Sequence, residues 1–185
     1  FDDTRYARSD TRSHPATGSV EPGVPLRLAF RVSRLEGAGC AALPGAHVEL
    51  WQCNARGLYS GVSDSQGDTS GRKFLRGYQL TDASGMARFV TIYPGWYPGR
   101  TVHLHFMIRS GQAGARRDVF TSQLYFDDAL SDRMFARAPY ADRGPRPVPN
   151  AHDGIFRRAG SQLMLAVAER DAGLEASFDI GLEAR

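Results

Sequence analysis

Apolar and polar residues alternate along several short stretches of this chain. In residues 25–32, PLRLAFRV, the apolar side chains Leu26, Leu28, Phe30 and Val32 occupy every second position. Successive side chains of a β-strand point to opposite faces, so this spacing predicts a strand with one buried face. Similar patterns predict strands at residues 45–53, at both ends of 76–92, and at 101–110, 119–126, 161–169 and 174–182.

Turn residues separate these predicted strands. Residues 82–85, Asp-Ala-Ser-Gly, and 171–173, Asp-Ala-Gly, are typical turn sequences. Only residues 127–138 have the spacing of a helix, and residues 1–20 are polar without periodicity, which predicts an N-terminal arm. Many short strands with little helix predict an all-β fold, an antiparallel β-sandwich, and we expect one domain over residues 1–185.

The composition excludes several classes of partner. The chain has 185 residues and a net charge of +3, with both signs interspersed and no basic block interleaved with aromatic residues. We therefore expect no nucleic-acid partner. No apolar run is long enough to cross a bilayer, so we expect no membrane partner either.

Two histidines share one face of the predicted strand at residues 101–110. Val102, Leu104 and Phe106 alternate with His103 and His105, so the imidazoles lie together on the face opposite the apolar side chains. Two imidazoles one pleat apart can bind one metal ion, and imidazole suits zinc, copper, nickel and iron alike. The pair by itself is equally compatible with ordinary strand histidines.

The residues available as further ligands narrow the choice of metal. Between Glu49 and Glu169 the chain has no glutamate, which argues against a cupin-like, zinc or copper enzyme that would use His103 and His105 with a carboxylate. Tyrosines are plentiful instead, at positions 59, 78, 93 and 97. With a reference pKa near 10, a phenol ionises at neutral pH only beside a strongly acidic cation such as ferric iron.

Four separated motifs resemble the intradiol ring-cleavage dioxygenases, the family of protocatechuate 3,4-dioxygenase and catechol 1,2-dioxygenase. They are CAALPGAHVELWQCNARGLYSG, FLRGYQLTDASGMARFVTIYPGWYPGRTVHLHF, TSQLYF and NAHDGIFR, in the order of the family. The resemblance implies a non-haem Fe(III) held by Tyr59, Tyr97, His103 and His105. Tyr93 competes for the role of Tyr97, and the motif favours Tyr97.

The same resemblance implies an activity and its catalytic residues. A catechol would react with O2 and be cleaved between its two hydroxyl groups, with both oxygen atoms entering a cis,cis-muconate product. Tyr97 would leave the metal, Arg100 would stabilise negative charge on the substrate, and Gln123 would donate a hydrogen bond. Leu58 and Trp96, each next to a proposed tyrosine ligand, are candidates for the substrate pocket together with Arg100. Without the resemblance, Arg100 and Gln123 would be an ordinary loop arginine and strand glutamine.

The two cysteines bear on location. The segment around Cys40 and Cys53 resembles the small secreted branch of the family, which implies a disulfide between them and export from the cell. An exported enzyme of this kind would meet plant-derived or lignin-derived catechols.

A non-catalytic module is the alternative from a different class. The strand, turn and strand pattern at residues 45–57 and 81–89 also occurs in prealbumin-like β-sandwich modules for binding or adhesion. The joint presence of the two tyrosines, Arg100, the histidine pair and Gln123 favours the enzyme. The sequence fixes neither the ring substituents of the substrate nor the oligomeric state.

Overall fold

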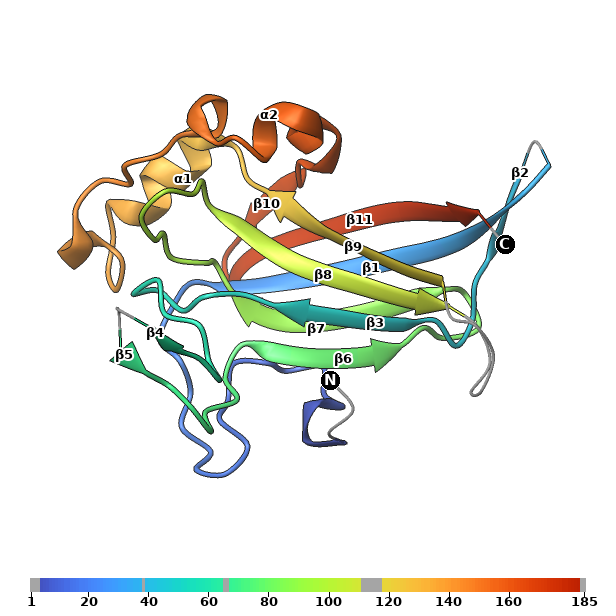
Figure 1. The fold of residues 1–185 in the computed structure, drawn as a ribbon, viewed down its shortest axis with the longest axis horizontal. Coiled ribbons are helices and arrows are strands. Elements are labelled where there is room, and N and C mark those ends of the chain that lie inside the picture. Colours follow the sequence, from blue (N-terminus) through green and yellow to red (C-terminus); the bar gives the residue numbers. More distant parts are fainter. Residues whose placement is uncertain (1–3, 38, 65–66, 111–117, 184–185) are drawn as a thin grey trace.

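The computed structural model describes residues 4–37, 39–64, 67–110 and 118–183. Two β-sheets face each other across the core (Figure 1). Sheet A has the order β6 (Arg76–Leu80), β3 (His47–Trp51), β8 (His103–Ser110) and β9 (Asp118–Tyr125). In sheet B, β1 (Pro25–Glu36) pairs with β11 (Gly173–Glu183), β7 (Met86–Ile92) and β2 (Gly39–Ala42), and β10 (Val167–Arg170) pairs with β11.

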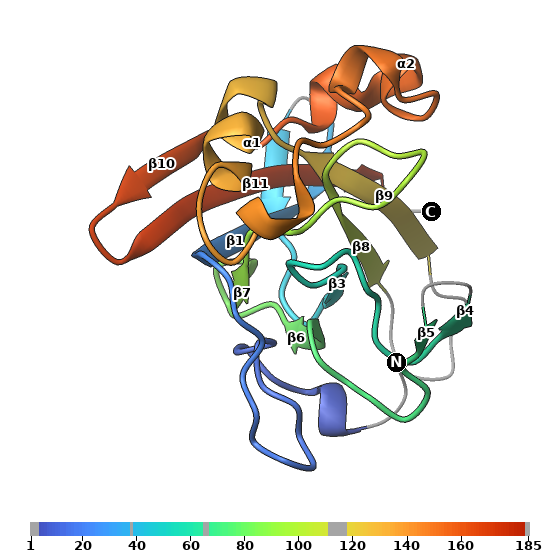
Figure 2. The same ribbon diagram turned by 90° about the vertical axis from the view of Figure 1, so that its left-hand side faces the viewer.

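The helices gather over one end of the sandwich (Figure 2). They are α1 (Asp128–Phe135), α2 (Phe156–Ala159) and the 3-10 turns η2 (Ala141–Arg143), η3 (Asn150–His152) and η4 (Gly160–Leu163). A further 3-10 turn, η1 (Thr4–Tyr6), and a small hairpin of β4 (Ser63–Asp64) and β5 (Gly67–Asp68) lie outside the two sheets. The prediction of an all-β sandwich with little helix is confirmed. No helix in the described part of the chain is long and apolar enough to span a bilayer.

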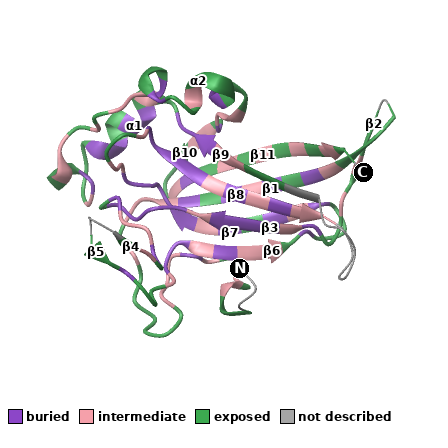
Figure 3. Ribbon diagram, in the orientation of Figure 1, coloured by how far each residue is buried: buried purple, intermediate pink, exposed green. Residues whose placement is uncertain are grey.

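The alternating positions of the sequence form the core between the sheets. Leu26, Leu28, Phe30 and Val32 of β1 are at most 1% exposed, and the ring of Phe30 lies 5.4 Å from that of Phe106 on β8. Burying such side chains stabilises a fold by about 1.5–3 kcal/mol each. Buried positions follow the middle of both sheets, while β2 and much of β11 remain exposed (Figure 3).

Three features of the topology differ from a simple series of hairpins. The turn at residues 82–85 carries the chain from β6 in sheet A to β7 in sheet B, and the Asp82 carboxylate accepts the backbone N–H groups of Ser84 and Met86. The first and last long strands, β1 and β11, pair in parallel, whereas the other sheet pairs are antiparallel. The described part of the N-terminal arm is packed, because Asp10 bridges Val90 on β7 and Thr11 is fully buried.

The predicted disulfide between Cys40 and Cys53 is wrong, because both cysteines are free. Cys40 is exposed on β2, whereas Cys53 is buried beyond the far end of β3, where its thiol donates to the carbonyl of Gly95 (3.3 Å). The strand β3, with five residues and a length of roughly 16 Å, lies between the two cysteines along the chain. A disulfide needs Cα atoms within about 7 Å of each other, so this arrangement keeps the two thiols apart.

This arrangement predicts how the thiols react. Burial raises the pKa of the Cys53 thiol to about 12, and the reactive form of cysteine is the thiolate. In the native protein, iodoacetamide should therefore alkylate Cys40 alone, and both cysteines should react after unfolding in guanidinium, as read by peptide mass spectrometry. Two cysteines that react only after reduction would instead establish the disulfide.

Candidate active site

The register of β8 presents the histidine pair. Leu104 and Phe106 point into the core and are fully buried, so His103 and His105 point to the outer face of sheet A. Their Nε2 atoms lie 3.1 Å apart. Since β8 lies between β3 and β9, other side chains surround this pair on the same face.

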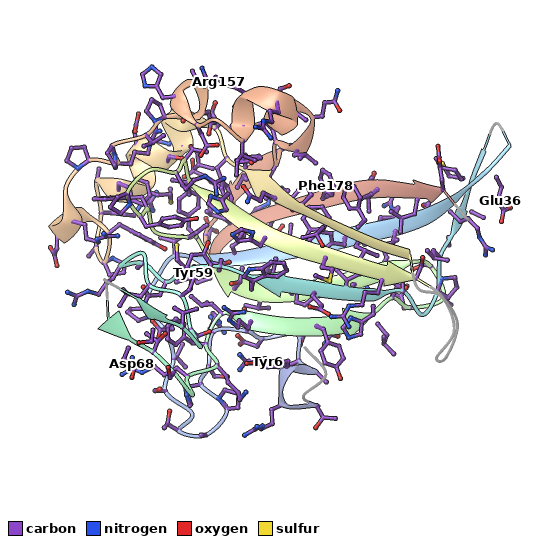
Figure 4. All side chains as sticks on the ribbon, viewed as in Figure 1. Tyr6, Glu36, Tyr59, Asp68, Arg157 and Phe178 are labelled. Atoms are coloured by element: carbon purple, nitrogen blue, oxygen red, sulfur yellow. The ribbon has the colours of Figure 1, made fainter. Side chains whose placement is uncertain are left out.

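Two tyrosines reach the histidines from loops. Tyr59 follows β3 and Tyr97 precedes β8. The Tyr97 Oη lies 3.0 Å from the Nε2 of His103, and the Tyr59 Oη lies 3.1 Å from the Nε2 of His105 and 3.5 Å from that of His103. Figure 4 labels Tyr59, at the end of the sandwich that carries the helices. Two phenol oxygens and two imidazole nitrogens therefore converge.

Close backbone contacts hold the two tyrosine loops together. A side chain at Gly95 would place its Cβ 2.4 Å from the carbonyl oxygen of Asn54, and one at Gly57 would clash with the carbonyl of Trp96. Glycine is therefore required at both positions for the loops to approach this closely. The Asn54 side chain also accepts the backbone N–H groups of Arg56 and Leu58 (3.0 Å each), which shapes the loop before Tyr59.

The imidazoles are held neutral and oriented. Nδ1 of His103 lies 2.7 Å from the carbonyl oxygen of Thr101, which can only accept, so Nδ1 carries the proton and Nε2 keeps its lone pair. His105 stacks on Trp51, its cross-strand neighbour, with ring centroids 5.0 Å apart. Burial lowers the pKa of His103 to about 4 and that of His105 to about 3. Both rings can therefore act as neutral ligands at pH 7.

The donor set fits a highly charged metal ion. Burial raises the pKa of both Tyr59 and Tyr97, so these phenols would ionise only when a strong cation binds. Ligand bonds of about 2.0–2.2 Å, usual for nitrogen and oxygen donors, put neighbouring donors roughly 3 Å apart. The contacts that join these four atoms, at 3.0–3.5 Å, are close to that spacing. Across the described residues, no group of three or more His, Cys, Asp or Glu offers another metal site.

Tyr93, the competitor of Tyr97, lies elsewhere. It is fully buried, and its hydroxyl is bonded to Ser131 on α1 (2.7 Å), while its ring packs against Phe126. The structure thus brings Tyr97, and not Tyr93, to the histidines.

A polar network joins the predicted catalytic residues. Nε of Arg100 donates to Asp153 (2.8 Å), and its Nη2 donates to Oε1 of Gln123 (2.6 Å). The same Oε1 accepts the hydroxyl of Tyr125 (2.9 Å). Because two donors meet this oxygen, the amide nitrogen of Gln123 is left to donate elsewhere. Register places Gln123 opposite His105 and Tyr125 opposite His103.

A cavity of about 290 Å³ adjoins the site. Its walls come from β9 and from the segment that includes α2 and η4, and they comprise His105, Thr121, Ser122, Gln123, Tyr125, Ile155, Arg158, Ala159, Gly160 and Leu163. This size is at the lower end of ligand pockets and suits a single substituted ring.

None of the three pocket candidates, Leu58, Trp96 and Arg100, is among the residues that line this cavity, although Arg100 donates to Gln123, which does line it. Trp96 donates through Nε1 to the carbonyl of Gly144 (3.3 Å), and the guanidinium of Arg143 covers its ring at 4.1 Å. Leu58 and Trp96 flank the tyrosines on their loops, and their contact with substrate stays a prediction.

Sequence reasoning assigned no role to Asp153 or Tyr125. Asp153 is buried, and its carboxylate accepts from two backbone N–H groups that follow it in the sequence DGIF. Such a local turn is a recognisable use of aspartate. Its hydrogen bond to Arg100 joins residues 53 positions apart, so no local sequence pattern predicts it.

Comparisons with known proteins identify the family of the whole chain. A family model described as Dioxygenase matches residues 2–184. The protocatechuate 3,4-dioxygenase beta chain of Burkholderia cepacia is 32% identical over 176 residues, which is 90% of this chain and 69% of that one. The chain belongs to the intradiol ring-cleavage dioxygenase family.

Other family members extend the match. An intradiol ring-cleavage dioxygenase from Tetranychus urticae superimposes with a TM-score of 0.83 at 26% identity, over 99% of this chain and 89% of that one. The dioxygenase domain of a carbohydrate-binding fusion protein from Streptomyces sp. SirexAA-E gives a TM-score of 0.62 at 29% identity, over 97% and 89%. Catechol 1,2-dioxygenase of Candida albicans is 35% identical over 92 residues, 48% of this chain and 29% of that one.

Membership of this family decides between the two classes of protein considered for the sequence, an enzyme and a non-catalytic binding module. As an intradiol dioxygenase the protein is an enzyme, an oxidoreductase of the dioxygenase type. The β-sandwich is therefore a scaffold for catalysis here, and the alternative of a non-catalytic prealbumin-like module is set aside.

The buried carboxylate of this dioxygenase predicts a pH dependence of stability. Burial alone would raise the pKa of Asp153, but the N–H groups of Phe156 and Thr101 and the Arg100 guanidinium outweigh it and lower the pKa to about 2. The unfolded value is about 3.9. A depressed folded pKa contributes stability that is complete above the unfolded pKa and is lost as pH falls through the folded pKa.

The free energy of unfolding of wild type should therefore exceed that of Asp153→Asn by a constant amount above about pH 5, and this difference should shrink between about pH 4 and 2. Denaturant unfolding of both proteins at a series of pH values measures it. A difference that does not change down to about pH 2 would contradict the assignment.

Proposed function

We propose that this enzyme uses a non-haem Fe(III) to cleave a catechol with O2 between its two hydroxylated carbons. Both oxygen atoms would enter the product, a cis,cis-muconate. The observation that carries the proposal is the convergence of Tyr59, Tyr97, His103 and His105, with donor contacts of 3.0–3.5 Å, beside a cavity of about 290 Å³.

The four converging side chains are the proposed iron ligands. Two neutral imidazoles and two phenolates would bring two negative charges, which favour the ferric over the ferrous ion. When bound, ferric iron would supply a Lewis acid that holds both catechol oxygens as anions and activates the ring toward O2. The carbonyl of Thr101 keeps the Nε2 of His103 free for that ion.

Tyr97 is the proposed ligand that exchanges with substrate. It lies on the loop before β8 and has one imidazole contact, whereas the Tyr59 Oη contacts both histidines. When Tyr97 moves away, its Oη can take one of the two protons that the catechol gives up, and the second would pass to solvent. The phenol then stays in the site as a neutral group, so the exchange leaves no unpaired charge.

Arg100 and Gln123 are the proposed groups that act on the substrate's charge. The guanidinium, held by Asp153 and Gln123, supplies a fixed positive charge beside the tyrosines for the negative charge that develops on the substrate. The amide nitrogen of Gln123 faces no acceptor in its own network and can donate to a substrate oxygen. Ile155 and Leu163 give the cavity apolar walls for the ring.

Plant-derived or lignin-derived catechols are the proposed source of substrate. One relative is the dioxygenase domain of a fusion with a carbohydrate-binding protein from a cellulolytic bacterium, a setting in which such compounds occur. Secretion also remains a proposal. Because both cysteines are free, a disulfide no longer supports it. The chemistry proposed here does not depend on where the enzyme acts.

Product analysis tests the reaction. Incubation with catechol under ¹⁸O₂ should give cis,cis-muconate that carries two ¹⁸O atoms by mass spectrometry. A ring-opened semialdehyde would mean cleavage beside the hydroxyl pair. If catechol, protocatechuate and hydroxyquinol all stay unchanged with iron-loaded protein, the proposed substrate class is excluded.

Absorption spectroscopy tests the ligands. Tyrosinate bound to Fe(III) should give a broad visible band that shifts to longer wavelength when catechol is added under argon. Tyr59→Phe and Tyr97→Phe should each weaken or shift this band. The matched control is Tyr93→Phe, which removes a buried hydroxyl bonded to Ser131 and should cost about 1–3 kcal/mol of stability with the band unchanged.

If the iron-loaded protein is colourless, or if Tyr93→Phe alone abolishes the band, the ligand assignment is wrong.

A further inference from the structure

Asp153 is a buried carboxylate at the junction of the active site and the cavity wall. Its residue is 1% exposed, and it lies between η3 and α2. Its Oδ2 accepts from Nε of Arg100 (2.8 Å) and from the backbone N–H of Thr101 (2.9 Å). Its Oδ1 accepts from the backbone N–H groups of Ile155 and Phe156 (2.8 Å each). All four contacts come from donors, so the carboxylate is saturated.

These bonds join two segments that are distant in sequence. Residues 100 and 101 lead into β8 and its histidines, whereas Ile155 lines the cavity and Phe156 begins α2. Phe156 also packs edge-on against Tyr125, with ring centroids 5.0 Å apart. One side chain therefore sets how the cavity wall sits against the strand that carries the metal site.

The bond to Arg100 is directional. Nε points to Asp153 while Nη2 points to Gln123, so two acceptors on different elements fix the plane of the guanidinium. An arginine with a single partner could rotate about its long side chain. The side chain of Arg100 is 20% exposed, whereas that of Asp153 is fully buried.

We propose that Asp153 is a positioning residue for catalysis, which holds the Arg100 guanidinium in the orientation that stabilises charge on the substrate. This inference rests on the proposed function, because it assigns Asp153 a part in the same reaction. Asp153 acts through Arg100 and does not touch the substrate. A purely structural role, as an anchor for α2, is the competing explanation.

Asparagine at position 153 separates the two roles. Its side-chain oxygen can still accept from Ile155 and Phe156 and so keep the start of α2 in place. Its NH2 group would then face the N–H groups of Arg100 and Thr101, which are donors as well. The variant therefore releases the guanidinium while the wall keeps its anchor.

A double-mutant cycle tests the proposal. Asp153→Asn should lower kcat/KM for catechol by about 10- to 100-fold, mostly in kcat, since small errors in the position of a catalytic group have effects of this size. Arg100→Lys keeps the charge but cannot reach both acceptors, and should show a similar loss. If Asp153 acts through Arg100, the double variant should lose no more than about 3-fold beyond Arg100→Lys.

A second readout separates position from folding. The dissociation constant for catechol under argon, measured by calorimetry, should change much less than kcat, because orientation matters most in the transition state. Tyr93→Phe, which loses a buried hydrogen bond away from the cavity, is the control for reduced stability and should keep the wild-type kcat.

Each failure has a distinct outcome. If wild type consumes catechol and the two substitutions multiply in the double variant, Asp153 does not act through Arg100 and the inference is overturned. Wild-type activity in Arg100→Lys overturns it as well, even if Asp153→Asn does not fold. If iron-loaded wild type consumes neither catechol nor protocatechuate nor hydroxyquinol, the proposed function fails and the positioning role fails with it.

Discussion

The two-residue period of β8 is the constraint on which the rest of the site depends. Its even positions, among them Leu104 and Phe106, fill the core, and this burial fixes which face receives His103 and His105. A slip of one residue would exchange the two faces and remove the site. The neighbouring strands follow from the same register, since β3 brings Trp51 and β9 brings Gln123 beside His105. The core therefore specifies the site.

Charge balance explains how such a site can be buried. The imidazoles are neutral, and Arg100 is paired with Asp153, so these groups bring no net charge. Burial raises the pKa of the phenols of Tyr59 and Tyr97, so both are neutral until a cation binds. Only the attraction of a highly charged ion is strong enough to ionise both. Desolvation of these ligands would therefore favour the proposed ferric ion over ions of lower charge.

Local periodicity predicted most local features of this molecule. It was wrong at the start of the strand predicted over residues 161–169, since residues 161–163 lie in the 3-10 turn η4 and only β10 is a strand. The alternation in residues 25–32 gave β1, and residues 127–138 contain α1, because burial of one face has a sequence period. The parallel pairing of β1 with β11 and the crossing between sheets at residues 82–85 depend on distant segments, which no window reveals. The prediction of a disulfide was wrong for the same reason, because the distance between Cys40 and Cys53 in space cannot be read from their spacing in the sequence. Asp153 was missed because its partner, Arg100, lies far away in sequence.

The proposed function requires one iron ion among four particular atoms. Anomalous diffraction from a crystal of the purified protein, recorded on both sides of the iron absorption edge, tests it most directly. The account predicts one iron peak bonded to the Oη atoms of Tyr59 and Tyr97 and to the Nε2 atoms of His103 and His105. An iron peak at another place, or a metal at the histidines without either tyrosine, would contradict it.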